Sequence, residues 1–574
     1  MERILPYIQG LREIASVVFK SRLSESSLRI ISFDSGKEFG CLSVHVQDMT
    51  AGKPTGLIVR FALPLMLGSI FQQLYTVVDT IVVGKLIGVE ALASLGAADW
   101  PYMLVLGLVI GLTQGFSIKI SQCYGAEDYE GLKTAVTNSI VISAIVAAAV
   151  TALSLAFLKP LLHLLNTPQN VFGGAVRYLT VLFSGIAVVT AYNILSSILR
   201  ALGDSKSPLI AMILASVINI VLDIVFVASF HWGITGAAAA TVLGQLFSCF
   251  YCMKVVRGVP ILFLEAHHWK PGRKMAGSLV KIGTPMALQN AIISVGGMVV
   301  QYVINGYGSV YIAGFLATNK LYGLLELAAT SFGYSMSTFT GQNIGAGKIQ
   351  RIRIGMNAAL RICVAIACAI SVVMILFGRR ILMLFLSGTP DEVNAVLDVA
   401  YQYLFTMSCL LFVLYFLHLY RSALQGMGDT VIPMLSGLAE LVMRISTVLI
   451  LPSFIGERGL YYAEITAWTG AALILGTTYY IRMHGLLRRP KESGEITEEI
   501  TGESTKEITG DGFEEVGDGF EEVGDSSEES IGDSSGESTK ENPAEHDELI
   551  FSIEEGKLKM QENISKREEH YENI

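Results

Sequence analysis

The chain has 574 residues, of which 52% are hydrophobic and only 16% charged, and its mean hydropathy is +0.53. About a quarter of the residues of a soluble domain are charged, so this composition excludes an ordinary soluble protein. The net charge of −9 comes from one segment: residues 491–574 carry about −20, which leaves about +11 for the rest. No cleavable signal sequence is evident, because Arg12 and Glu13 interrupt the first apolar stretch.

Two segments flank the hydrophobic part of the chain. Residues 1–48 match nothing downstream, and two readings stay open: Met49 is the true start, or the apolar stretch at 4–19 belongs to a cytoplasmic amphipathic extension. Residues 488–574 form a low-complexity acidic tail. High charge and few apolar side chains cannot offset the entropy lost on ordering, so we expect a disordered cytoplasmic tail.

Between these segments lie apolar runs of about 20 residues or more, long enough to cross roughly 30 Å of hydrocarbon as helices. Proline occurs inside three of the runs, at Pro64, Pro101 and Pro285, where it should bend the helix. We predict twelve transmembrane helices, at about residues 57–84, 91–120, 133–158, 171–199, 208–230, 234–256, 279–305, 310–338, 355–378, 393–424, 431–454 and 459–484.

The second half of the chain repeats motifs of the first half in the same order. The Gly-Asp-x-x-x-Pro motif at residues 203–208 returns at 428–433, and Gln-x-x-Gly-Ala at 122–126 returns at 342–346. In a hydrophobic chain, such a duplication is typical of a transporter built from repeats. The Gly-Asp motifs end one helix and cap the next, so we expect a structural role for them.

Six helices in each copy bring the second copy into the membrane in the same orientation as the first. We therefore predict an all-α membrane protein with two parallel six-helix lobes around a central cavity. The N-lobe covers residues 49–256, a cytoplasmic linker 257–278, and the C-lobe 279–487. The loops on one side carry about 18 Lys and Arg and those on the other about five, which predicts that both termini are cytoplasmic.

Ionisable side chains inside spans are candidates for function, because each costs about 2.5–3.5 kcal/mol at the centre of a membrane. The first half places Asp79 and Asp223 in spans one and five. Tyr178 and Thr241 lie at the same predicted depth as these two aspartates, roughly 9–11 Å below the outer surface at 1.5 Å per residue, and Asn219 lies one turn deeper. Asn219 is one turn from Asp223 on the same helix face. We expect these five side chains to converge on one site, where a proton or sodium ion binds. The alternative is that the two aspartates only form hydrogen bonds to neighbouring helices.

The second half keeps a tyrosine, Tyr403, at the position equivalent to Tyr178, but it lacks equivalents of the two aspartates. Its own intramembrane charges include Glu326, Glu440 and Arg444. Glu440 and Arg444 are four residues apart on one helix and could form a structural ion pair. The alternative is that Glu326, Glu440, Arg444 and Tyr403 contact a cationic substrate. No metal-ligand spacing and no Walker loop is evident, so we expect no metal, no cofactor and no ATP-driven step.

Taken together, the motifs resemble those of the MATE (multidrug and toxic compound extrusion) transporters, over about residues 49–487. The resemblance rests on the two-lobe pattern and on the following residues: Leu63-Pro64, Val78-Asp79-Thr80, Arg200-Ala201-Leu202-Gly203-Asp204 and Asn219-Ile220-Val221-Leu222-Asp223.

The resemblance implies an antiporter that expels organic cations or other amphipathic compounds in exchange for H⁺ or Na⁺. Its first-lobe cation site would comprise Asp79, Tyr178, Asn219, Asp223 and Thr241, and Pro64 matches the proline at which span one is thought to bend. Where one branch of the family has second-lobe acids, this chain has Ile293 and Leu414, which argues against ion coupling in the second lobe.

Two other functions stay open at this point. A flippase for lipid-linked or polysaccharide precursors would share the fold, although it would favour a strongly basic cavity. A non-transporting receptor would use the acidic tail as its effector. We expect a monomeric, multi-pass protein of the cell membrane that acts on small amphipathic or cationic molecules, binds no nucleic acid and is not an enzyme.

Overall fold

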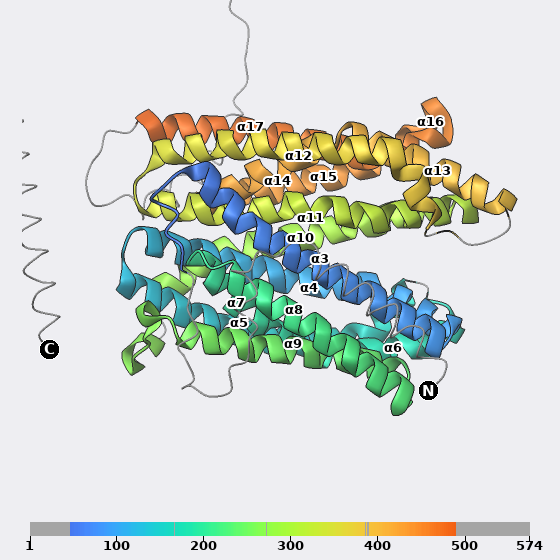
Figure 1. Cartoon of the computed structure of the whole chain (residues 1–574), viewed down its shortest axis with the longest axis horizontal. Helices are drawn as coiled ribbons and strands as arrows, with labels where there is room; N and C mark the ends of the chain where they lie inside the picture. The colour runs from blue at the N-terminus through green and yellow to red at the C-terminus, as the bar shows by residue number, and fades with distance from the viewer. Residues whose placement is uncertain (1–45, 166, 271, 385, 387–389, 489–574) are drawn as a thin grey trace, which may run out of the picture. The chain divides into compact units, whose positions relative to one another are not determined.

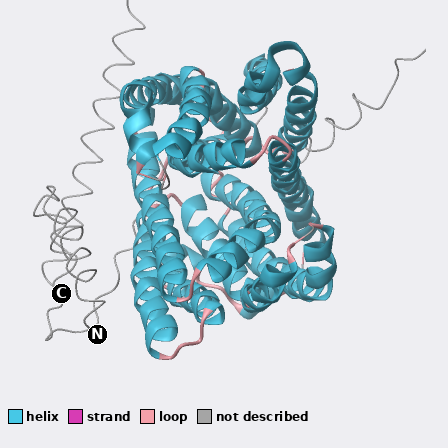
Figure 2. Ribbon diagram, turned by 90° about the vertical axis from the view of Figure 1, so that its right-hand side faces the viewer, coloured by secondary structure: helices cyan, strands magenta, loops and turns pink. Residues whose placement is uncertain are grey.

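The computed structural model describes residues 46–165, 167–270, 272–384, 386 and 390–488. Every regular element in these ranges is a helix, which confirms the predicted all-α class (Figure 2). The expectations for residues 1–45 and for the acidic tail lie outside the described residues. The α-helices are α3 Pro54–Leu86, α4 Val89–Gly125, α5 Tyr129–Leu164, α6 Gln169–Ser184, α7 Ile186–Ala201, α8 Lys206–Asp223, α9 Ile234–Arg257, α10 Arg273–Asn305, α11 Ser309–Gly345, α12 Ile349–Met383, α13 Pro390–Cys409, α14 Leu411–Gly426, α15 Val431–Ile450, α16 Pro452–Ile455 and α17 Ala463–Arg488.

Each of the twelve predicted spans falls on a helix or on a bent pair of helices. By length and composition, eight helical stretches in the described part of the chain could cross a membrane, or up to ten if each of two bent pairs is one span. One of the eight, Val431–Arg488, is 58 residues long and covers two predicted spans. A multi-span helical membrane protein is therefore established, whereas the count of twelve crossings stays a prediction.

The fourth and tenth predicted spans are each broken into two helices. α6 and α7 meet at Gly185 with a bend of 47°, and α13 and α14 meet at Leu410 with a bend of 53°. A Cβ atom at Gly185 would lie 2.5 Å from Cγ2 of Val242, so glycine is needed for close packing against α9 at this bend. In contrast, α3, α4 and α10 continue as helices through their internal prolines.

The two halves of the chain repeat the same helix contacts. α3 packs on α8 as α10 packs on α15, α4 on α7 as α11 on α14, and α8 on α9 as α15 on α17. In Figure 1, α5–α9 of the first half lie below and α12–α17 of the second half lie above, with α3, α4, α10 and α11 between them. This equivalence of neighbours agrees with the duplication read from the sequence.

The first helix of each half crosses from one core to the other. Ile58 and Phe61 at the start of α3 belong to the buried cluster of the second half, whereas Val83 near its end belongs to a first-half cluster. α10 does the reverse, with Leu279 in a first-half cluster and Ile304 in the second-half cluster. We call this arrangement the helix exchange. It interlocks the two halves through their first helices.

The ends of α4, α7, α11 and α14 meet where both Gly-Asp motifs lie, and we call this region the signature end. Gln122 Nε2 donates a hydrogen bond to the carbonyl of Gly426 at 3.1 Å, and Gln342 Nε2 donates to the carbonyl of Ala201 at 2.9 Å. Both glutamines are buried. Gln122 is equivalent to Gln342 in the repeat, and Ala201 to Gly426, so the two bonds form a reciprocal pair between the halves, which we call the glutamine clasp.

The Gly-Asp motifs have the capping role predicted for them. Gly203 and Gly428 have φ of +89° and +93°, in the region that favours glycine. Asp204 Oδ1 accepts hydrogen bonds from the backbone N–H groups two and three residues on, at 2.9 and 3.0 Å. Asp429 Oδ1 accepts one from the N–H three residues on, at 3.4 Å. These bonds satisfy donors at the helix start that have no partner within the helix.

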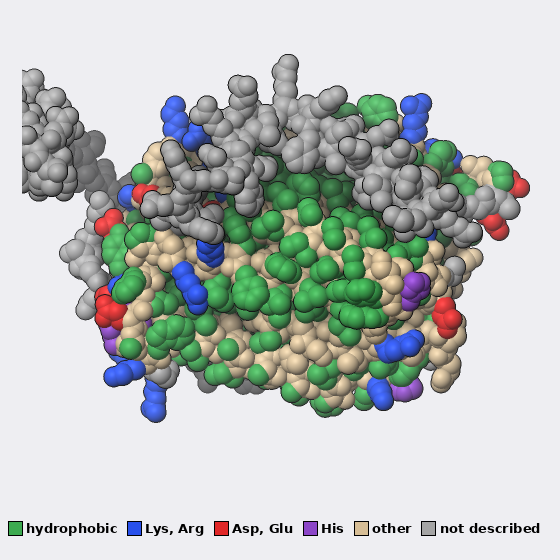
Figure 3. Space-filling model, turned by 60° about the horizontal axis from the view of Figure 1, so that its bottom comes forward, with side chains coloured by type: hydrophobic (Ala, Val, Ile, Leu, Met, Phe, Trp, Pro, Cys, Tyr) green, Lys and Arg blue, Asp and Glu red, His purple; other side chains and the backbone are tan. Residues whose placement is uncertain are grey.

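The surface has the composition that a lipid environment requires. Hydrophobic side chains cover much of the face shown in Figure 3, and the Lys and Arg visible there lie toward its two ends. Large apolar side chains such as Leu153, Leu376 and Leu473 are more than half exposed. A broad apolar surface of this kind is stable against lipid and would be a liability in water.

Candidate functional site

The five side chains of the predicted ion site come from four helices of the first half. Asp79 lies on α3, Tyr178 on α6, Asn219 and Asp223 on α8, and Thr241 on α9. α8 packs on both α3 and α9, and α6 packs on α9, so the four helices form one group. Asp79 and Asp223 are 6% and 0% exposed, and Thr241 is half-buried. We call the five residues Asp79, Tyr178, Asn219, Asp223 and Thr241 the acidic site.

Asn219 links Thr241 to Asp223 within the acidic site. With its amide nitrogen toward α9, Asn219 Nδ2 donates to Thr241 Oγ1 at 3.3 Å. With the amide turned over, Nδ2 donates to Asp223 Oδ2 at 3.2 Å and the amide oxygen accepts from the Thr241 backbone N–H at 3.2 Å. In the second orientation the amide nitrogen meets an acceptor and the amide oxygen meets a donor, so we adopt it. The structure therefore brings Asn219, Asp223 and Thr241 into direct contact.

The two carboxylates of the acidic site interact electrostatically with each other. One oxygen of each, Asp79 Oδ1 and Asp223 Oδ1, is buried and accepts no hydrogen bond from the described part of the chain. Removing a carboxylate from water without a compensating partner costs on the order of several kcal/mol. A proton or a small cation bound between the two acids would remove this cost.

The helix that carries Asp223 changes its winding directly after this residue. α8 ends at Asp223 and continues as a π-helix, η1 Ile224–Ser229. π-helical turns are rare and occur frequently at functional sites. Phe226 stacks on Trp232 with ring centroids 4.8 Å apart, so the turn is covered by aromatic side chains. No local signal in the sequence predicts this change of winding.

Sequence reasoning misses one acid that adjoins the acidic site. Asp99 of α4 interacts electrostatically with Asp79, and also with Lys320 of α11 in the second half. Tyr178 interacts with both Asp79 and Asp99. Asp99 lies inside the predicted span 91–120, so the rule that selects Asp79 applies equally to it. Asp99 and Lys320 are exposed, and they extend the charged region from the acidic site toward the second half.

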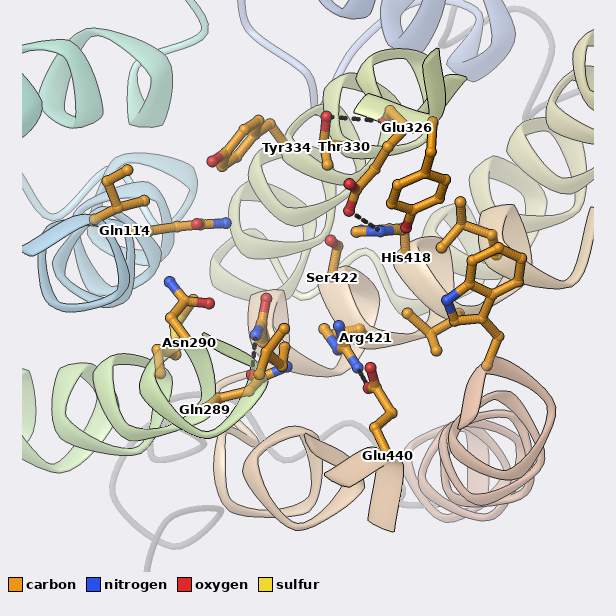
Figure 4. Close-up of a pocket in the computed structure, with 18 of the residues that line it drawn as sticks. Gln114, Gln289, Asn290, Glu326, Thr330, Tyr334, His418, Arg421, Ser422 and Glu440 are labelled. Carbon is orange, nitrogen blue, oxygen red and sulfur yellow. Dashed lines mark hydrogen bonds and ion pairs between the residues drawn. The ribbon is translucent and has the colours of Figure 1, made fainter. Parts of the chain in front are cut away.

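A cavity of about 230 Å³ lies among helices of the second half (Figure 4). Its walls come from α10, α11, α14, α15 and α17, and Ile110 and Gln114 of α4 close one side. Glu326, Glu440 and Arg444, three of the four predicted second-half contacts, line this space. We call it the second-half cavity.

The ion pairs beside this cavity include the one that the sequence predicts, Glu440 with Arg444, and two that it does not. Arg444 lies 4.0 Å from Glu440, its predicted partner, but only 2.7 Å from Glu464 of α17. Glu440 also pairs, more closely, with Arg421 of α14. A spacing of four residues on one helix allows an ion pair, but acids and bases on neighbouring helices compete for the same groups. The sequence alone does not show which neighbours they are.

His418 joins the lining of the cavity, whereas Tyr403 does not. His418 of α14 has Nε2 3.3 Å from Glu326 Oε1. Tyr403 does not line the cavity: it is 2% exposed and stacks on Phe315 with ring centroids 4.2 Å apart. The structure thus brings Glu326, Glu440 and Arg444 together and places Tyr403 in the core beside them.

Comparison with known proteins decides the family. The family model MatE matches residues 64–225 and 285–450, more than half of the chain. The chain belongs to the MATE family. Probable multidrug resistance protein YpnP of Bacillus subtilis (strain 168) is 33% identical over 350 residues, which cover 60% of this chain and 77% of that protein.

Other relatives of this MATE transporter are more distant. Multidrug export protein MepA of Staphylococcus saprophyticus is 23% identical over 428 residues, covering 74% of this chain and 93% of that protein. A FAD transporter of Shewanella oneidensis is 24% identical over 417 residues, covering 71% and 90%. The relatives establish a membrane transporter of small molecules and not an enzyme.

Solved structures share its fold. A MOP superfamily transporter from Pyrococcus furiosus superimposes with a TM-score of 0.73 at 24% identity, covering 79% of this chain and 100% of that one. A MATE crystal structure in complex with MaL6 gives 0.72 at 24% identity, covering 77% and 99%. These likenesses support the MATE fold.

Two positions of this MATE transporter need separate mention. Ile293 and Leu414, which the resemblance implies are the counterparts of the second-lobe acids of one branch, both line the second-half cavity as apolar residues. Pro64 lies inside α3, within the part that packs in the second-half core, and it precedes the part that carries Asp79.

Proposed function

We propose that this MATE transporter is a secondary antiporter that exports organic cations and other amphipathic compounds in exchange for H⁺ or Na⁺, with Asp79 and Asp223 as the carboxylates that bind the ion. The observation that carries the proposal is the pair of interacting, buried carboxylates, each with one oxygen lacking a partner among the described residues. Relatives named for multidrug resistance and multidrug export support the substrate class and do not favour a precursor flippase.

Charge competition explains how ion and drug would exchange. Two buried carboxylates that interact electrostatically repel each other, and each is poorly solvated. A bound proton or sodium ion neutralises part of that charge, and so does an organic cation nearby. Because either one relieves the same unfavourable charge, binding of one weakens binding of the other. Reciprocal weakening of two ligands is the thermodynamic requirement for antiport.

The remaining residues of the acidic site have supporting roles in this proposal. Asn219 and Thr241 orient Asp223 or supply oxygen ligands when the ion is sodium. Tyr178 interacts electrostatically with Asp79 and would respond to a change in its charge. Pro64 is the point at which α3 bends as Asp79 changes state, because proline removes a backbone hydrogen bond there.

Transport itself would follow alternating access of the two lobes. With the cavity open to the outside, the acidic site takes up an ion and the drug leaves; with the cavity open to the inside, the ion leaves and the drug binds. We place both termini in the cytoplasm and the protein, as a monomer, in the cell membrane. In the second lobe, Glu326, Glu440 and Arg444 are the proposed substrate contacts, whereas Tyr403 would reach substrate only after rearrangement.

Purified protein in liposomes tests the proposal directly. Export of a fluorescent organic cation is measured under an imposed proton gradient and then under a sodium gradient. Asp79→Asn and Asp223→Asn should each reduce gradient-driven export at least about 10-fold, the effect of losing about 1.4 kcal/mol of coupling. Asp398→Asn is the matched control, because that carboxylate is exposed and pairs with Arg379 at the surface.

Two outcomes would overturn the proposal. Export by well-folded Asp79→Asn protein at the rate of the unmodified chain would remove the coupling role of that residue. Export that ignores both gradients would remove the antiport mechanism. Thr241→Ala separates the ions, because loss of an oxygen ligand should weaken sodium-driven export and leave proton-driven export nearly unchanged.

A further inference from the structure

The segment that precedes α3 crosses the signature end from one half of the chain to the other. Val46 packs against a buried cluster of the first half, whereas Met49 is fully buried in the cluster of the second half. Between them, the carbonyl oxygen of Gln47 lies against Gly203, where an added Cβ atom would be 2.0 Å from it. We call residues 46–53 the strap. It covers the seam at which the glutamine clasp joins α7 to α11.

The second half holds the strap by its backbone. The N–H of Met49 donates a hydrogen bond to Gln342 Oε1 at 2.8 Å. Arg351 of α12 donates to the carbonyl oxygens of Met49 and Ala51, at 3.3 and 2.9 Å. Lys348 Nζ donates to the carbonyl oxygen of the intervening residue at 3.1 Å. Hydrogen bonds from charged donors are stronger than those from neutral donors, so this part of the strap is firmly attached to α11 and α12.

The first half holds the strap by packing. Within the described ranges, no hydrogen bond joins residues 46–51 to α4–α9. The contact consists of the half-buried side chain of Val46 and the close approach of Gln47 to Gly203. Because this contact is the weaker of the two, it should break first when the halves separate at the signature end. The strap would then stay on the second half, whose core also buries the start of α3.

The repeat shows that the fold does not require such a bridge. The segment directly before α10 is equivalent to the strap, and it docks on α5 of the first half, where Thr137 Oγ1 donates to the carbonyl of His268 at 2.7 Å. Gly428, the equivalent of Gly203, has a similar φ of +93°. The nearest atom to a Cβ added there would be Gln122 Nε2, at 3.3 Å, and not a strap carbonyl. In the described part of the chain, the strap therefore covers one Gly-Asp motif and leaves the other open.

Two readings of these contacts lead to different expectations. If the strap is only a static end of α3, its packing on the first half has no part in closing the signature end. We infer instead that the strap is a latch: its contact with the first half closes the signature end and breaks when that end opens, whereas its bonds to α11 and α12 persist. The inference rests on the proposed function only in taking the signature end to open during transport. Val46 and Gln47 then leave the first half once in every cycle.

The thiol of Cys123 provides the first measurement. It lies near the end of α4 at the signature end and is 6% exposed, so a maleimide should react with it at a rate set by the fraction of open molecules. The purified full chain is used in detergent, with the other six cysteines replaced by alanine. Val46→Asp places a charge in the apolar contact with the first half and should raise the rate at least about 10-fold. Val46→Ala removes apolar area alone and should raise it about 2- to 5-fold, which keeps the test if the aspartate variant fails to fold.

Two variants of α12 complete the rate measurement. Arg351→Gln removes the donors to two strap carbonyls and should also raise the rate, because the strap can then detach from the second half. Arg353→Gln is the matched control: it removes the same charge from an exposed position two residues further along the helix, so the rate should not change.

Spin labels show which half keeps the strap. Lys53 on the strap, Tyr129 at the start of α5 and Gln350 at the start of α12 are exposed and are labelled two at a time. The labelled chain carries Gln122→Ala, which removes one bond of the glutamine clasp and so raises the share of open molecules. In the aspartate variant, pulsed electron paramagnetic resonance should show longer Tyr129–Gln350 and Lys53–Tyr129 distances and an unchanged Lys53–Gln350 distance.

Three outcomes would overturn the inference. The first is an unchanged rate at Cys123 in both Val46 variants. The second is a faster rate without any separation of Tyr129 from Gln350, which would mean that the strap frays locally. The third is a label on Lys53 that stays with Tyr129 while the halves separate.

The measurements also separate this inference from the proposed function, because neither needs an ion gradient. If the Val46 variants open the signature end but export is independent of gradients, the antiport proposal fails and the latch stands. If gradient-driven export depends on Asp79 but Cys123 reacts at the same rate in every variant, the antiport proposal stands and the latch fails.

Discussion

The glutamine clasp should set how readily the signature end opens. Gln122→Ala removes the hydrogen bond from Gln122 to the carbonyl of Gly426, and Gln342→Ala removes the one to Ala201. In an alternating-access cycle this end must open, and both bonds join residues of opposite halves. Each substitution therefore destabilises the closed arrangement and not the open one, in which water hydrates the freed carbonyl.

The size of the effect follows from what each substitution leaves behind. Loss of one partner in a buried hydrogen bond leaves a carbonyl unpaired, at a cost of about 1–3 kcal/mol. That cost shifts the ratio of closed to open molecules about 5- to 150-fold. The shift caused by Gln342→Ala should lie toward the upper end of this range, because Gln342 Oε1 also accepts a hydrogen bond from the backbone N–H of Met49 at 2.8 Å. The double variant should deviate from additivity, because the backbones of α4 and α11 are in direct contact at the two glutamines and the two sites are therefore not independent.

Spin labels placed on either side of the signature end measure the opening. Tyr129 and Gln350, near the exposed starts of α5 and α12, are the attachment sites, and pulsed electron paramagnetic resonance gives the distribution of distances between them. Gln169→Ala, at an exposed glutamine at the start of α6, is the control and should change nothing. Distance distributions that are identical with and without the glutamines would refute the reasoning, because the bonds would then contribute nothing to closure.

Three more predictions concern folding and binding. Gly203→Ala should lower the melting temperature, because Gly203 has φ of +89° and an added Cβ would lie 2.0 Å from a backbone carbonyl oxygen. Arg421→Gln alone should destabilise the protein by about 3–5 kcal/mol by leaving the buried Glu440 carboxylate short of a partner, and adding Glu440→Gln should restore much of that loss in thermal unfolding. Asn219→Ala should weaken ion binding. The measurement is the shift in melting temperature on adding sodium or lowering pH, which should be smaller in the variant. An undiminished shift would show that Asn219 has no role at Asp223.

The repeat made most of the fold predictable. Equivalent motifs in the two halves fix the order and orientation of the helices, and long apolar runs fix their approximate bounds. The bends at Gly185 and Leu410 were not predictable in the same way, since the bend at Gly185 depends on Val242, which is distant in the sequence. Proline marks a potential bend locally, whereas close packing of a glycine against another helix leaves no local pattern.

The candidate site was predictable to a different extent in each half. Asp79 and Asp223 stand out because a charge in an apolar run is costly, and the structure does bring Asp223, Asn219 and Thr241 into contact. In the second half, spacing along α15 identifies the 4.0 Å pair of Glu440 with Arg444, but the closer partners of these two residues come from α14 and α17. Intrahelical spacing predicts the closest pair only when no neighbouring helix offers a closer charge.

The helix exchange has a consequence for how the chain is made. Synthesis proceeds from the N-terminus, and domains generally fold in that order. The start of α3 is buried against helices of the second half, which emerge from the ribosome much later. Until then the core that buries Ile58 and Phe61 has not formed, and α3 is only partly packed against the rest of the first half. We therefore expect a late joining step in the biosynthesis of this transporter, in which α3 packs on α11 and α10 packs on α4, and damage to either contact should trap a half-assembled chain before any substrate is met.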